Sequence, residues 1–441
     1  MSLRIPHYLN EFNSIPEDWK LKKLLDVSMK ITDGTHKTPK YVDKGVPFLS
    51  TTNLQPFHPD FNFSSYQKFI TKKEHEELII RCKPELNDIL ISKCGTIGRS
   101  QIVSVDYDFS IFVGLALLKP DLRIILSTYL EQLLNSNVMQ KQMELTSPGS
   151  TRKTLTINAI GNLLIPVPSL VEQRGIVEVL GTVDECIRLT DAVIERAEEL
   201  KRGLMQRLLT RGIGHTEYKE TPLGKIPKTW KISTFGKECN IGTGGTPRRN
   251  QSDYYNGNIP WVKSTELNYG IISDTEEHIS KKALEESNAK IYPTGTLLIA
   301  MYGLEAVGTR GRCAILGVNA ATNQAIAAIQ PKKQILPRFL YYYYQQMGNL
   351  IMKYAEGTKR KNLSLSIMKK IPIIVPPIKE QEKIVKIIEN QDDKTNIENH
   401  KMNQLNILKQ GLMQSLLSGK IRVELKGDGL HRIRYGRKAN N

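Results

Sequence analysis

The sequence predicts a mixed α/β (α+β) protein with two globular domains separated by two long helices, which pair as an antiparallel coiled coil with pseudo-twofold symmetry. Three observations support this prediction. The 441-residue chain repeats its own sequence at a nearly constant shift. Each copy holds a long segment whose apolar residues recur every three or four positions. The rest of each copy alternates short apolar runs with glycine-rich turns, which is typical of strands joined by loops.

Length and composition fit a globular protein of more than one domain. A chain of 441 residues is too long for one ordinary core, and 40% hydrophobic with 24% charged residues is a normal balance. No apolar run approaches the ~20 residues of a membrane span. The longest run, Ile111 to Leu118, is expected to form one buried strand. Because Met1 to Pro6 lacks the apolar stretch of a signal peptide, we expect a cytoplasmic protein.

The five cysteines are odd in number and scattered, with no C-x-x-C pair. We therefore expect buried thiols rather than a disulfide framework or a zinc site. The residues are Cys82, Cys94, Cys186, Cys239 and Cys313.

The charge balance indicates a polyanionic partner. The sequence has 62 Lys and Arg against 45 Asp and Glu, a net charge of +17 with a pI of about 9.4. Such an excess repels itself in the folded state unless a partner neutralises it. A nucleic acid fits, because phosphate neutralisation dominates that kind of binding. A lysine-rich bias of the whole proteome is the alternative that composition leaves open.

The clearest repeat aligns the second half of each copy. Leu363 to Leu417 falls on Leu155 to Leu209 at a shift of 208 positions without a gap. The matching pairs are Val167-Pro168 with Val375-Pro376, Glu172-Gln173 with Glu380-Gln381, Ile176-Val177 with Ile384-Val385, Leu200-Lys201 with Leu408-Lys409, Gly203 to Gln206 with Gly411 to Gln414, and Leu208-Leu209 with Leu416-Leu417. So many matches at one shift indicate an internal duplication.

Each copy begins with an Ile-Pro-x-x-Trp motif, at Ile15–Trp19 and at Ile226–Trp230. Between this motif and the long helix the copies agree only in scattered places, such as Val46-Pro47-Phe48 with Ile259-Pro260-Trp261. A closely repeated frame with divergent interiors suits a ligand with two unlike halves, such as an asymmetric, bipartite DNA site. Neutral drift of surface loops after duplication would explain part of the divergence.

Two long helices are predicted, from Glu172 to about Thr210 and from Glu380 to Leu417. The first would be on the order of 55–60 Å long. Its expected seam is Ile176, Val179, Val183, Cys186, Val193, Ala197, Leu200 and Leu204. The expected seam of the second is Ile384, Ile387, Ile388, Leu405, Leu408, Leu412 and Leu416, interrupted by polar Gln391, Lys394, Glu398 and Lys401. One polar seam position there could fix the register. The alternative to mutual pairing is that each helix packs on its own domain as ordinary core.

Each interior is expected to be mixed α/β. The predicted strands are Val46–Ser50, Asp88–Ser92 and Phe112–Leu118 in the first copy, and Ile259–Val262, Thr296–Ala300 and Ala325–Ile329 in the second. A helix follows in each copy, near Ser127–Glu144 and Pro337–Tyr354. The tyrosines Tyr341 to Tyr344 are expected to pack partly into a core rather than stack on bases.

Basic residues recur in three glycine-containing turns of each copy, at 34–39, 93–99 and 149–153 and at 242–249, 302–312 and 357–361. Such turns can bring backbone N–H groups and cations onto phosphates, or an arginine to a guanine edge. A solvated turn looks the same in sequence, so the recurrence in both copies is what favours a DNA-facing surface. The candidate DNA-binding residues are Lys37, Lys40, Lys93, Arg99, Arg152, Lys153, Arg248, Arg249, Arg310, Arg312, Lys359, Arg360 and Lys361.

Sequence motifs of catalysis are lacking. The chain has no G-x-S-x-G elbow, P-loop, H-E-x-x-H or Asn-Pro-Pro-aromatic tetrapeptide, and its histidines show no ligand spacing. The sequence therefore predicts no catalytic and no metal-binding residues.

These features together resemble the specificity subunit of type I restriction–modification systems. The resemblance rests on the Ile-Pro-x-x-Trp motifs, on the proline-Glu-Gln-Ile stretches at Val167–Ile176 and Val375–Ile384, and on Leu-Leu-Ser-Gly-Lys-Ile at Leu416–Ile421. It covers nearly the whole chain except about the last twenty residues. It implies a non-catalytic subunit with two target-recognition domains, each reading one half of a split double-stranded DNA sequence, while the paired helices act as a ruler.

The resemblance also implies partners. Two modification (methyltransferase) subunits would dock on the helices, bring S-adenosylmethionine and methylate adenine, and restriction subunits that use ATP would join them for cleavage. No cofactor is expected on this chain, since S-adenosylmethionine, ATP and Mg²⁺ are expected on the partner subunits. The residues implied to belong to the frame rather than to the DNA-binding surface are Glu172, Gln173, Ile176, Glu380, Gln381 and Ile384.

The expected domains are residues 1–154 and 216–362 for target recognition, 155–215 and 363–422 for the conserved regions with the long helices, and 423–441 for a basic tail. The tail either adds phosphate contacts or is disordered. Two other functions stay open: a self-contained restriction or modification enzyme of type II-like kind with degenerate motifs, and a clamp that binds DNA without regard to sequence.

Overall fold

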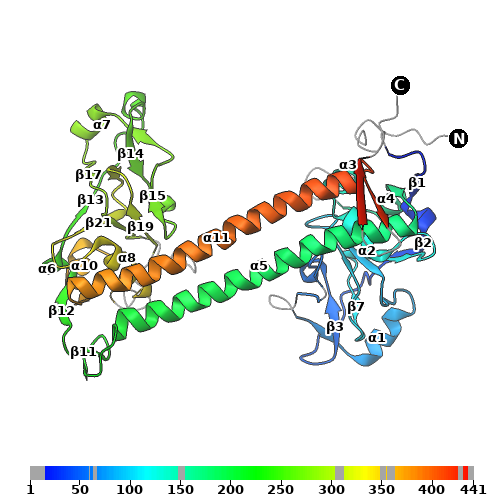
Figure 1. The fold of residues 1–441 in the computed structure, drawn as a ribbon, viewed down its shortest axis with the longest axis horizontal. Coiled ribbons are helices and arrows are strands. Elements are labelled where there is room, and N and C mark those ends of the chain that lie inside the picture. The colour runs from blue at the N-terminus through cyan, green and yellow to red at the C-terminus, as the bar shows by residue number, and fades with distance from the viewer. Residues whose placement is uncertain are drawn as a thin grey trace. The chain divides into compact units, whose positions relative to one another are not determined.

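The computed structural model describes residues 15–58, 60–62, 67–147, 154–302, 312–347, 354, 363–425 and 431–435. The chain forms two compact units. Unit 1 comprises Met1–Ala192 and His400–Asn441, and unit 2 comprises Val193–Asn399. Two long helices, α5 (Leu170–Arg211) and α11 (Ile378–Leu416), are labelled in Figure 1. Each contributes one part to unit 1 and the other part to unit 2. The predicted extents of both helices are confirmed to within two residues.

Unit 1 contains a four-stranded antiparallel sheet in the order β2-β8-β5-β6. Its strands are β2 (Ser28–Asp33), β8 (Leu115–Pro120), β5 (Ile89–Ser92) and β6 (Ser100–Ile102). A smaller sheet joins β4 (Phe69–Ile70), β3 (Val46–Leu49) and β7 (Ser110–Ile111), and a separate pair joins β1 (Lys20–Lys23) to β9 (Leu164–Val167). The helices of this part are α1 (Lys72–Ile79), α2 (Ser127–Leu134), α3 (Asn137–Thr146) and α4 (Ile157–Gly161).

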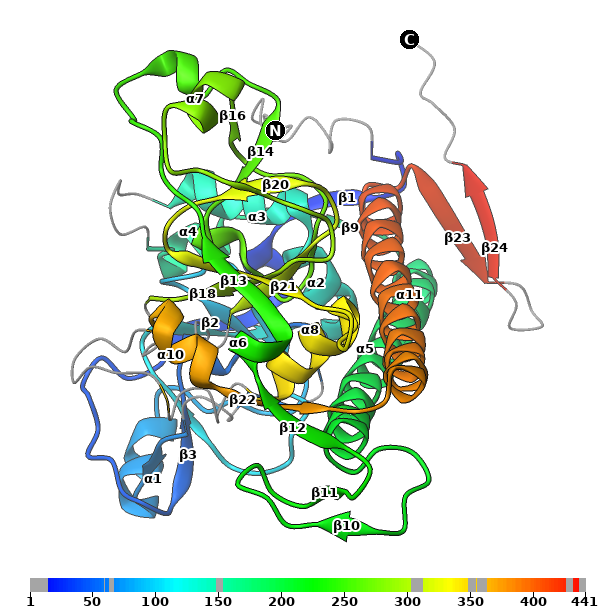
Figure 2. The ribbon, with the colours of Figure 1, turned by 90° about the vertical axis from the view of Figure 1, so that its left-hand side faces the viewer.

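Unit 2 contains a five-stranded sheet in the order β13-β21-β18-β19-β15, several strands of which face the viewer in Figure 2. Its strands are β13 (Cys239–Thr243), β21 (Ile326–Pro331), β18 (Leu297–Ala300), β19 (Cys313–Leu316) and β15 (Ile271–Ile272). The second sheet joins β16 (His278–Ile279), β14 (Ile259–Val262), β20 (Ala320–Thr322) and β17 (Ile291–Tyr292), and β12 (Lys231–Thr234) pairs with β22 (Pro372–Val375). Unit 2 also holds α6 (Phe235–Glu238), α7 (Lys281–Glu285), α8 (Pro337–Gln346), α10 (Leu365–Lys370) and the short pair β10 (Tyr218–Lys219) with β11 (Ile226–Pro227).

The two units share one topology despite their divergent interior sequences. The order β2-β8-β5-β6 in unit 1 is the order β13-β21-β18-β19 in unit 2, and β4-β3-β7 corresponds to β16-β14-β20. In both units the strand that follows the Ile-Pro-x-x-Trp motif pairs antiparallel with the strand that precedes the long helix. The duplication predicted from the sequence therefore extends through the interiors, where few residues match.

The core of each unit includes residues of both long helices. In unit 1, Ile176 and Leu180 of α5 and Met413 and Leu416 of α11 join the core around Trp19. In unit 2, α5 contributes Met205, Leu208 and Leu209, and α11 contributes Ile384, Val385 and Ile388. The beginning of one helix therefore packs beside the end of the other within each unit, as an antiparallel pair requires. The alternative in which each helix packs only on its own domain is not what the structure shows.

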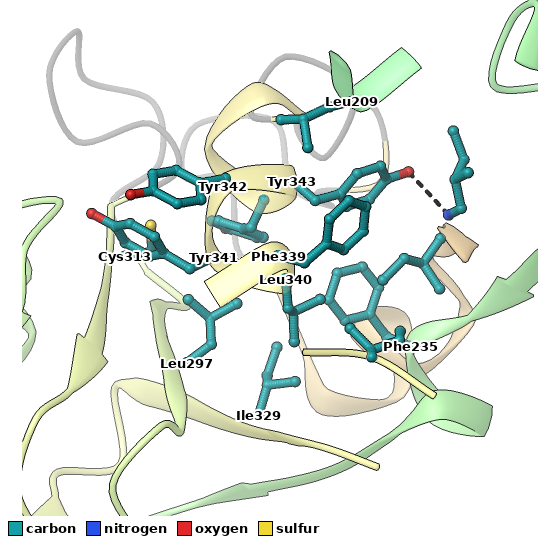
Figure 3. Close-up of a cluster of buried hydrophobic side chains, with 14 of the residues drawn as sticks. Leu209, Phe235, Leu297, Cys313, Ile329, Phe339, Leu340, Tyr341, Tyr342 and Tyr343 are labelled. Atoms are coloured by element: carbon teal, nitrogen blue, oxygen red, sulfur yellow. Dashed lines mark hydrogen bonds between the residues drawn. The ribbon is translucent and has the colours of Figure 1, made fainter. Parts of the chain in front are cut away.

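The four tyrosines of α8 lie in the core of unit 2, as the sequence predicted. Figure 3 labels three of them, Tyr341, Tyr342 and Tyr343. Each is at most 5% exposed, and they pack with Phe339 and Leu340 against strand residues such as Leu297 and Ile329. The Tyr341 hydroxyl donates to the carbonyl of Tyr269, and the Tyr343 hydroxyl accepts from the backbone N–H of Ile374 at 3.3 Å. These rings therefore stabilise the unit rather than face a ligand.

The predicted helix seam is wrong at several positions. Cys186, Val193 and Leu200 of α5 are exposed, as are Ile387 and Leu408 of α11. The less exposed positions of α5 include Leu180, Val183, Ile187, Thr190, Ile194, Ala197, Lys201, Leu204 and Leu208; those of α11 include Ile384, Ile388, Gln391, Thr395, Glu398, Met402, Leu405, Lys409, Leu412 and Leu416. Both sets keep the alternating three- and four-residue spacing of a coiled coil. The prediction followed apolar residues only, whereas the observed seam includes polar ones.

Gln391 is one of the four polar residues of α11 among which a position that fixes the register was predicted. It is 7% exposed, and its Nε2 donates to the backbone carbonyl of Ala197 on the facing helix at 3.1 Å. A buried amide that finds its partner at only one relative position of two helices favours that position. The structure thus gives the polar stretch of α11 a specific contact with α5.

Two smaller predictions inside unit 1 are also wrong. Ile111 to Leu118 is not one strand, because Phe112 to Gly114 form a turn in which the N–H of Leu115 bonds to the carbonyl of Phe112. The helix expected at Ser127–Glu144 is two helices, because Asn135 ends α2 and the Ser136 side chain caps α3 by accepting from the N–H of Met139. Such a cap competes with helix continuation.

The remaining expectations concern cysteines, the tail and membrane spans. All five cysteines are free thiols; three are buried, but Cys94 and Cys186 are exposed. The strand β23 (Ile421–Leu425), which begins two residues before the predicted basic tail, pairs antiparallel with β24 (His431–Tyr435) inside the tail. In the part of the chain that the structure describes, no helix is both long and apolar enough to cross a membrane.

Candidate nucleic-acid interface

Two of the basic turns predicted in unit 1, at 34–39 and 93–99, meet at one end of its four-stranded sheet, and the third, at 149–153, lies outside the described residues. Strands β2 and β5 both run antiparallel to β8, so their carboxyl ends reach the same edge. There the Lys93 Nζ lies 2.5 Å from Asp33 Oδ2, which joins the turn after β5 to the turn after β2. The N–H of Leu155 bonds to the carbonyl of Lys93 at 2.9 Å and brings the segment before α4 to the same place.

Unit 2 builds the same edge with the same backbone contacts. The N–H of Leu363 bonds to the carbonyl of Met301 at 2.9 Å, and these two residues match Leu155 and Lys93 at the shift of 208. In the turn after β13, the N–H of Gly245 bonds to the carbonyl of Thr322 at 2.9 Å. The sheet edge is therefore a repeated structure, although its residues differ.

A glycine is required at the start of this turn in both units. A Cβ on Gly34 would overlap the carbonyl of Ile111, and a Cβ on Gly244 would overlap the carbonyl of Thr322. The backbone of the turn therefore lies directly against the neighbouring strand, which only glycine permits. This contact explains why glycine opens the two turns even though the residues that follow differ.

The predicted DNA-binding residues do not all have the same environment. Lys37, Lys40, Arg99 and Arg248 are exposed, and Arg312 is half-buried. The structure brings the turns that carry Lys37 and Arg99 to the same sheet edge. Six candidates lie outside the described residues: Arg152, Lys153, Arg310, Lys359, Arg360 and Lys361.

Lys93 differs from the expected exposed basic residue. It is 7% exposed and pairs with Asp33, which also binds the Arg81 guanidinium at 2.5 Å. Burial raises the pKa of Asp33, but the hydrogen bond and charge of Lys93, with His36 and Arg81, outweigh burial and hold the pKa below its usual value. The buried Lys93 therefore holds the turn after β5 against the turn after β2. Arg81, which was not among the predicted residues, remains largely exposed.

Each unit also presents a cation against an aromatic pair beside the first basic turn, a feature that sequence reasoning missed. In unit 2 the Arg249 guanidinium lies 4.6 Å from the ring centre of Tyr255 and 5.0 Å from that of Trp261. Its Nη1 lies 2.5 Å from Glu277 Oε2, and the side chain stays 53% exposed. In unit 1, Lys68 Nζ lies 3.8 Å from the ring centre of Tyr41.

One aromatic residue of each pair could have been found from a signal in the sequence. Tyr41 contacts Phe48 edge-on at 5.9 Å, and Tyr255 contacts Trp261 edge-on at 6.0 Å. Phe48 and Trp261 are the last residues of the matching Val-Pro-Phe and Ile-Pro-Trp segments. A basic residue held by such contacts keeps a fixed direction, which is what recognition of a planar base edge or a phosphate needs.

The residues implied to belong to the frame are buried, except for Glu380, which is partly buried. Gln173 and Gln381 are both 0% exposed and make the same three bonds. Gln173 accepts from the N–H of Leu126 at 2.8 Å and donates to the carbonyls of Ile124 and Pro168, each at 3.0 Å. In unit 2 the corresponding partners of Gln381 are Leu336, Gln334 and Pro376. The glutamine thus fixes the loop before a recognition-domain helix to the first turn of the long helix.

In the described residues, no group of three or more His, Cys, Asp or Glu side chains is arranged to hold a metal ion.

Comparison with known proteins gives a consistent result. The family model described as type I restriction modification DNA specificity domain matches twice, at residues 16–199 and 227–406. A putative type I restriction enzyme MjaX specificity subunit of Methanocaldococcus jannaschii is 25% identical over 429 residues, covering 94% of this chain and 96% of that protein. The EcoR124I/EcoR124II specificity subunit of Escherichia coli is 27% identical over 268 residues, covering 59% of this chain and 58% of that protein.

Solved structures show the same fold. A chain from a study of complex assembly and conformational transition of the type I R-M system aligns with a TM-score of 0.58 and 16% identity, over 91% of this chain and 98% of that one. The type I restriction–modification S subunit from M. genitalium aligns with a TM-score of 0.53 and 15% identity, over 92% and 97%. The chain therefore belongs to the family of type I restriction–modification DNA specificity subunits, non-catalytic proteins that recognise DNA sequence, and it carries one copy of the specificity domain in each half.

Proposed function

We propose that this chain recognises a bipartite, asymmetric DNA target, with one half-site read by each recognition domain, and directs methyltransferase and restriction subunits to that target. The observation that carries the proposal is the sheet edge built twice with the same backbone bonds and different side chains. A common backbone gives two domains one way of approaching DNA, and different side chains give them different base preferences.

Positions of the sheet edge that match between the two units carry side chains of different chemistry. Lys93, paired with Asp33 in unit 1, corresponds to Met301 in unit 2, which is 4% exposed and apolar. Thr35 of the first turn corresponds to Gly245, and each donates its N–H to the neighbouring strand. Two identical half-sites would not favour such differences, whereas two unlike half-sites would.

The long helices are the proposed docking surface for two modification subunits. Leu189, Val193 and Leu200 of α5 are 51%, 48% and 54% exposed, and Ile397 and Leu408 of α11 are 65% and 50% exposed. Large apolar side chains repeated at helical spacing on an exposed face are typical of a surface that a partner covers. On this proposal the partner subunits bind S-adenosylmethionine, ATP and Mg²⁺, and the complex works in the cytoplasm. This chain contributes only the recognition of the DNA sequence.

Reconstitution tests the proposal. The purified chain is incubated with duplex DNA, Mg²⁺ and S-adenosylmethionine, first alone and then with modification subunits of a related system, and the methylated bases are sequenced. We expect no methyl transfer by the chain alone and methylation of one split sequence in the mixture. Methylation or nicking by the chain alone would instead favour a self-contained enzyme. Binding that falls equally for all duplexes as salt rises, without sequence preference, would favour a clamp.

A further inference from the structure

Helices α5 and α11 are joined by a lysine–aspartate pair in each unit. In unit 1 the Lys409 Nζ lies 2.5 Å from Asp184 Oδ1, and in unit 2 the Lys201 Nζ lies 2.5 Å from Asp392 Oδ1. The pairs are related by the internal duplication, because a shift of 208 takes Asp184 to Asp392 and Lys201 to Lys409. Helix α5 therefore supplies the aspartate of one pair and the lysine of the other, and α11 does the reverse.

Each aspartate also binds a helix of its recognition domain. The Gln132 Nε2 on α2 donates to Asp184 Oδ2 at 2.7 Å, and the Tyr342 hydroxyl on α8 donates to Asp392 Oδ2 at 2.7 Å. One carboxylate in each unit thus connects three elements: both long helices and the domain helix packed beside them.

The lysines occupy seam positions, where a charge is unfavourable for stability. Lys409 is 7% exposed, and its Nζ lies 3.1 Å from the ring centre of Phe57. The side chain of Lys201 is 28% exposed. Replacing a buried ion pair by apolar residues is often neutral or stabilising, so stability alone does not explain a lysine at both positions. A polar residue in a coiled-coil seam is better explained by the register that it selects.

The spacing of the four residues allows both pairs in one register only. Asp184 and Lys201 are 17 positions apart on α5, and Asp392 and Lys409 are 17 positions apart on α11. In an antiparallel pair, equal spacing means that the register that forms one contact also forms the other.

Registers displaced by one heptad lose the pairing. Displacement in one direction places Val177 and Val385 opposite the two lysines, and displacement in the other direction places Asp191 opposite one lysine and Asn399 opposite the other. The observed register is therefore the one of the three in which each lysine faces a carboxylate.

We propose that Lys201, Lys409, Asp184 and Asp392 are positioning residues that fix the register of the two long helices, seat each recognition domain on them, and so select the length of DNA between the half-sites. This inference rests on the proposed bipartite target. One heptad of helix is about 10.5 Å, or roughly three base pairs of duplex DNA, so a change of register would appear as a change of tolerated spacer.

The test compares the wild-type chain with three variants. The uncharged variant keeps hydrogen-bond acceptors but removes both pairs, the swapped variant reverses one pair, and the control removes two exposed cations from the same helices. They are Lys201→Met with Lys409→Met, Asp184→Asn and Asp392→Asn; Asp184→Lys with Lys409→Asp; and Arg202→Met with Lys394→Met. Each full-length chain is mixed with modification subunits, and methylation is measured on DNA carrying the two half-sites at every spacer within about four base pairs of the native length.

We expect the wild type, the swapped variant and the control to methylate one spacer. The uncharged variant should methylate further spacers, including ones about three base pairs different, with the ratio of off-spacer to native methylation raised about tenfold or more, while its thermal midpoint is unchanged or higher. A folded uncharged variant with the wild-type spacer profile overturns the proposal, and so does a control that relaxes it. If the uncharged variant does not fold, the swapped variant decides: the native spacer alone supports the proposal, and relaxed spacing overturns it. Failure of the wild type to methylate any split sequence would instead reject the proposed function.

Discussion

The indole Nε1 of Trp19 donates a hydrogen bond of 2.9 Å to the carboxylate of Glu172, across 153 residues of chain. Unit 2 repeats this contact between Trp230 and Glu380, also at 2.9 Å. The two most recognisable repeated motifs, Ile-Pro-x-x-Trp and Pro-x-x-x-Glu-Gln, are thus the two sides of one buried contact. The contact connects the beginning of each recognition domain to the first turn of the long helix that follows it.

Replacing this tryptophan should destabilise its unit. Trp19→Phe removes a hydrogen bond to a charged acceptor and part of a side chain that is 4% exposed, so we expect a loss of about 2–4 kcal/mol in the free energy of unfolding. Urea unfolding followed by circular dichroism measures this loss. Trp230→Phe should have a similar effect in unit 2, and a loss below about 0.5 kcal/mol for both variants would contradict the role given to the contact.

The repeated glutamine should be even less replaceable. Gln173→Leu keeps the size of the side chain but leaves two carbonyls and one N–H without their partner, and we expect a loss of about 3–5 kcal/mol. The neighbouring Arg174→Leu, at an exposed position of the same helix turn, is the control and should change stability by less than about 0.5 kcal/mol. Equal unfolding midpoints for the two variants in urea would show that the three bonds matter little.

Glu131 should make the stability of unit 1 depend on pH. Burial raises the pKa of this carboxyl to about 7, partly opposed by the N–H groups of Phe57 and Ile102 that it accepts from. A pKa raised in the folded state means that the contribution is fully present below the unfolded value of 4.5 and is lost as pH rises through about 7. Glu131→Gln should therefore be more stable than the wild type at pH 8, by on the order of 2–3 kcal/mol, and should lose this advantage at pH 4.5.

The measurement for Glu131 is a series of urea unfolding curves between pH 4.5 and 8 for both proteins. The difference between variant and wild type should grow with pH. A difference that stays constant over this range would mean that Glu131 does not titrate there in the folded chain.

Lys93 and the exposed candidates should respond differently to substitution. Lys93→Met leaves Asp33 without its buried cationic partner, and we expect a loss of about 2–4 kcal/mol in stability. Lys37→Ala and Arg99→Ala should leave stability nearly unchanged but weaken DNA binding, and each should reduce the slope of log affinity against log salt by about 1 if it contacts a phosphate. Fluorescence anisotropy on a specific duplex over a salt series measures this. An unchanged affinity and slope for both variants would remove them from the DNA-binding surface.

The sequence was sufficient for the parts of the fold that depend on repetition and local pattern. The shift of 208 located both long helices, and the glutamate–glutamine motifs identified buried frame residues. It was insufficient where contacts between distant parts of the chain determine which residues are buried. Leu200 has the right spacing for the seam but is 54% exposed, because Lys201 beside it takes the seam position through its pair with Asp392. A search for apolar residues alone could not find a seam that contains lysine.

The candidate interface was predictable as a set of turns but not as a set of side chains. Lys93 has the local sequence of an exposed turn residue, and only the position of Asp33, 60 residues earlier, makes it a buried partner. Arg81 and Tyr255 carry no sequence signal of their own. Arg81 becomes a candidate because Asp33, which lies far from it in the chain, packs against it. Tyr255 becomes a candidate because Arg249, on the other side of a turn, packs against it.

Exchange of one recognition domain tests the central claim most directly. Residues 20–150 are replaced by the matching region of a related specificity subunit, the hybrid is combined with modification subunits, and methylated bases are sequenced. We predict that one half of the methylated sequence changes to that of the donor while the other half stays as in the wild type. A change in both halves, or in neither, would contradict the account of two separate readers carried by one repeated frame.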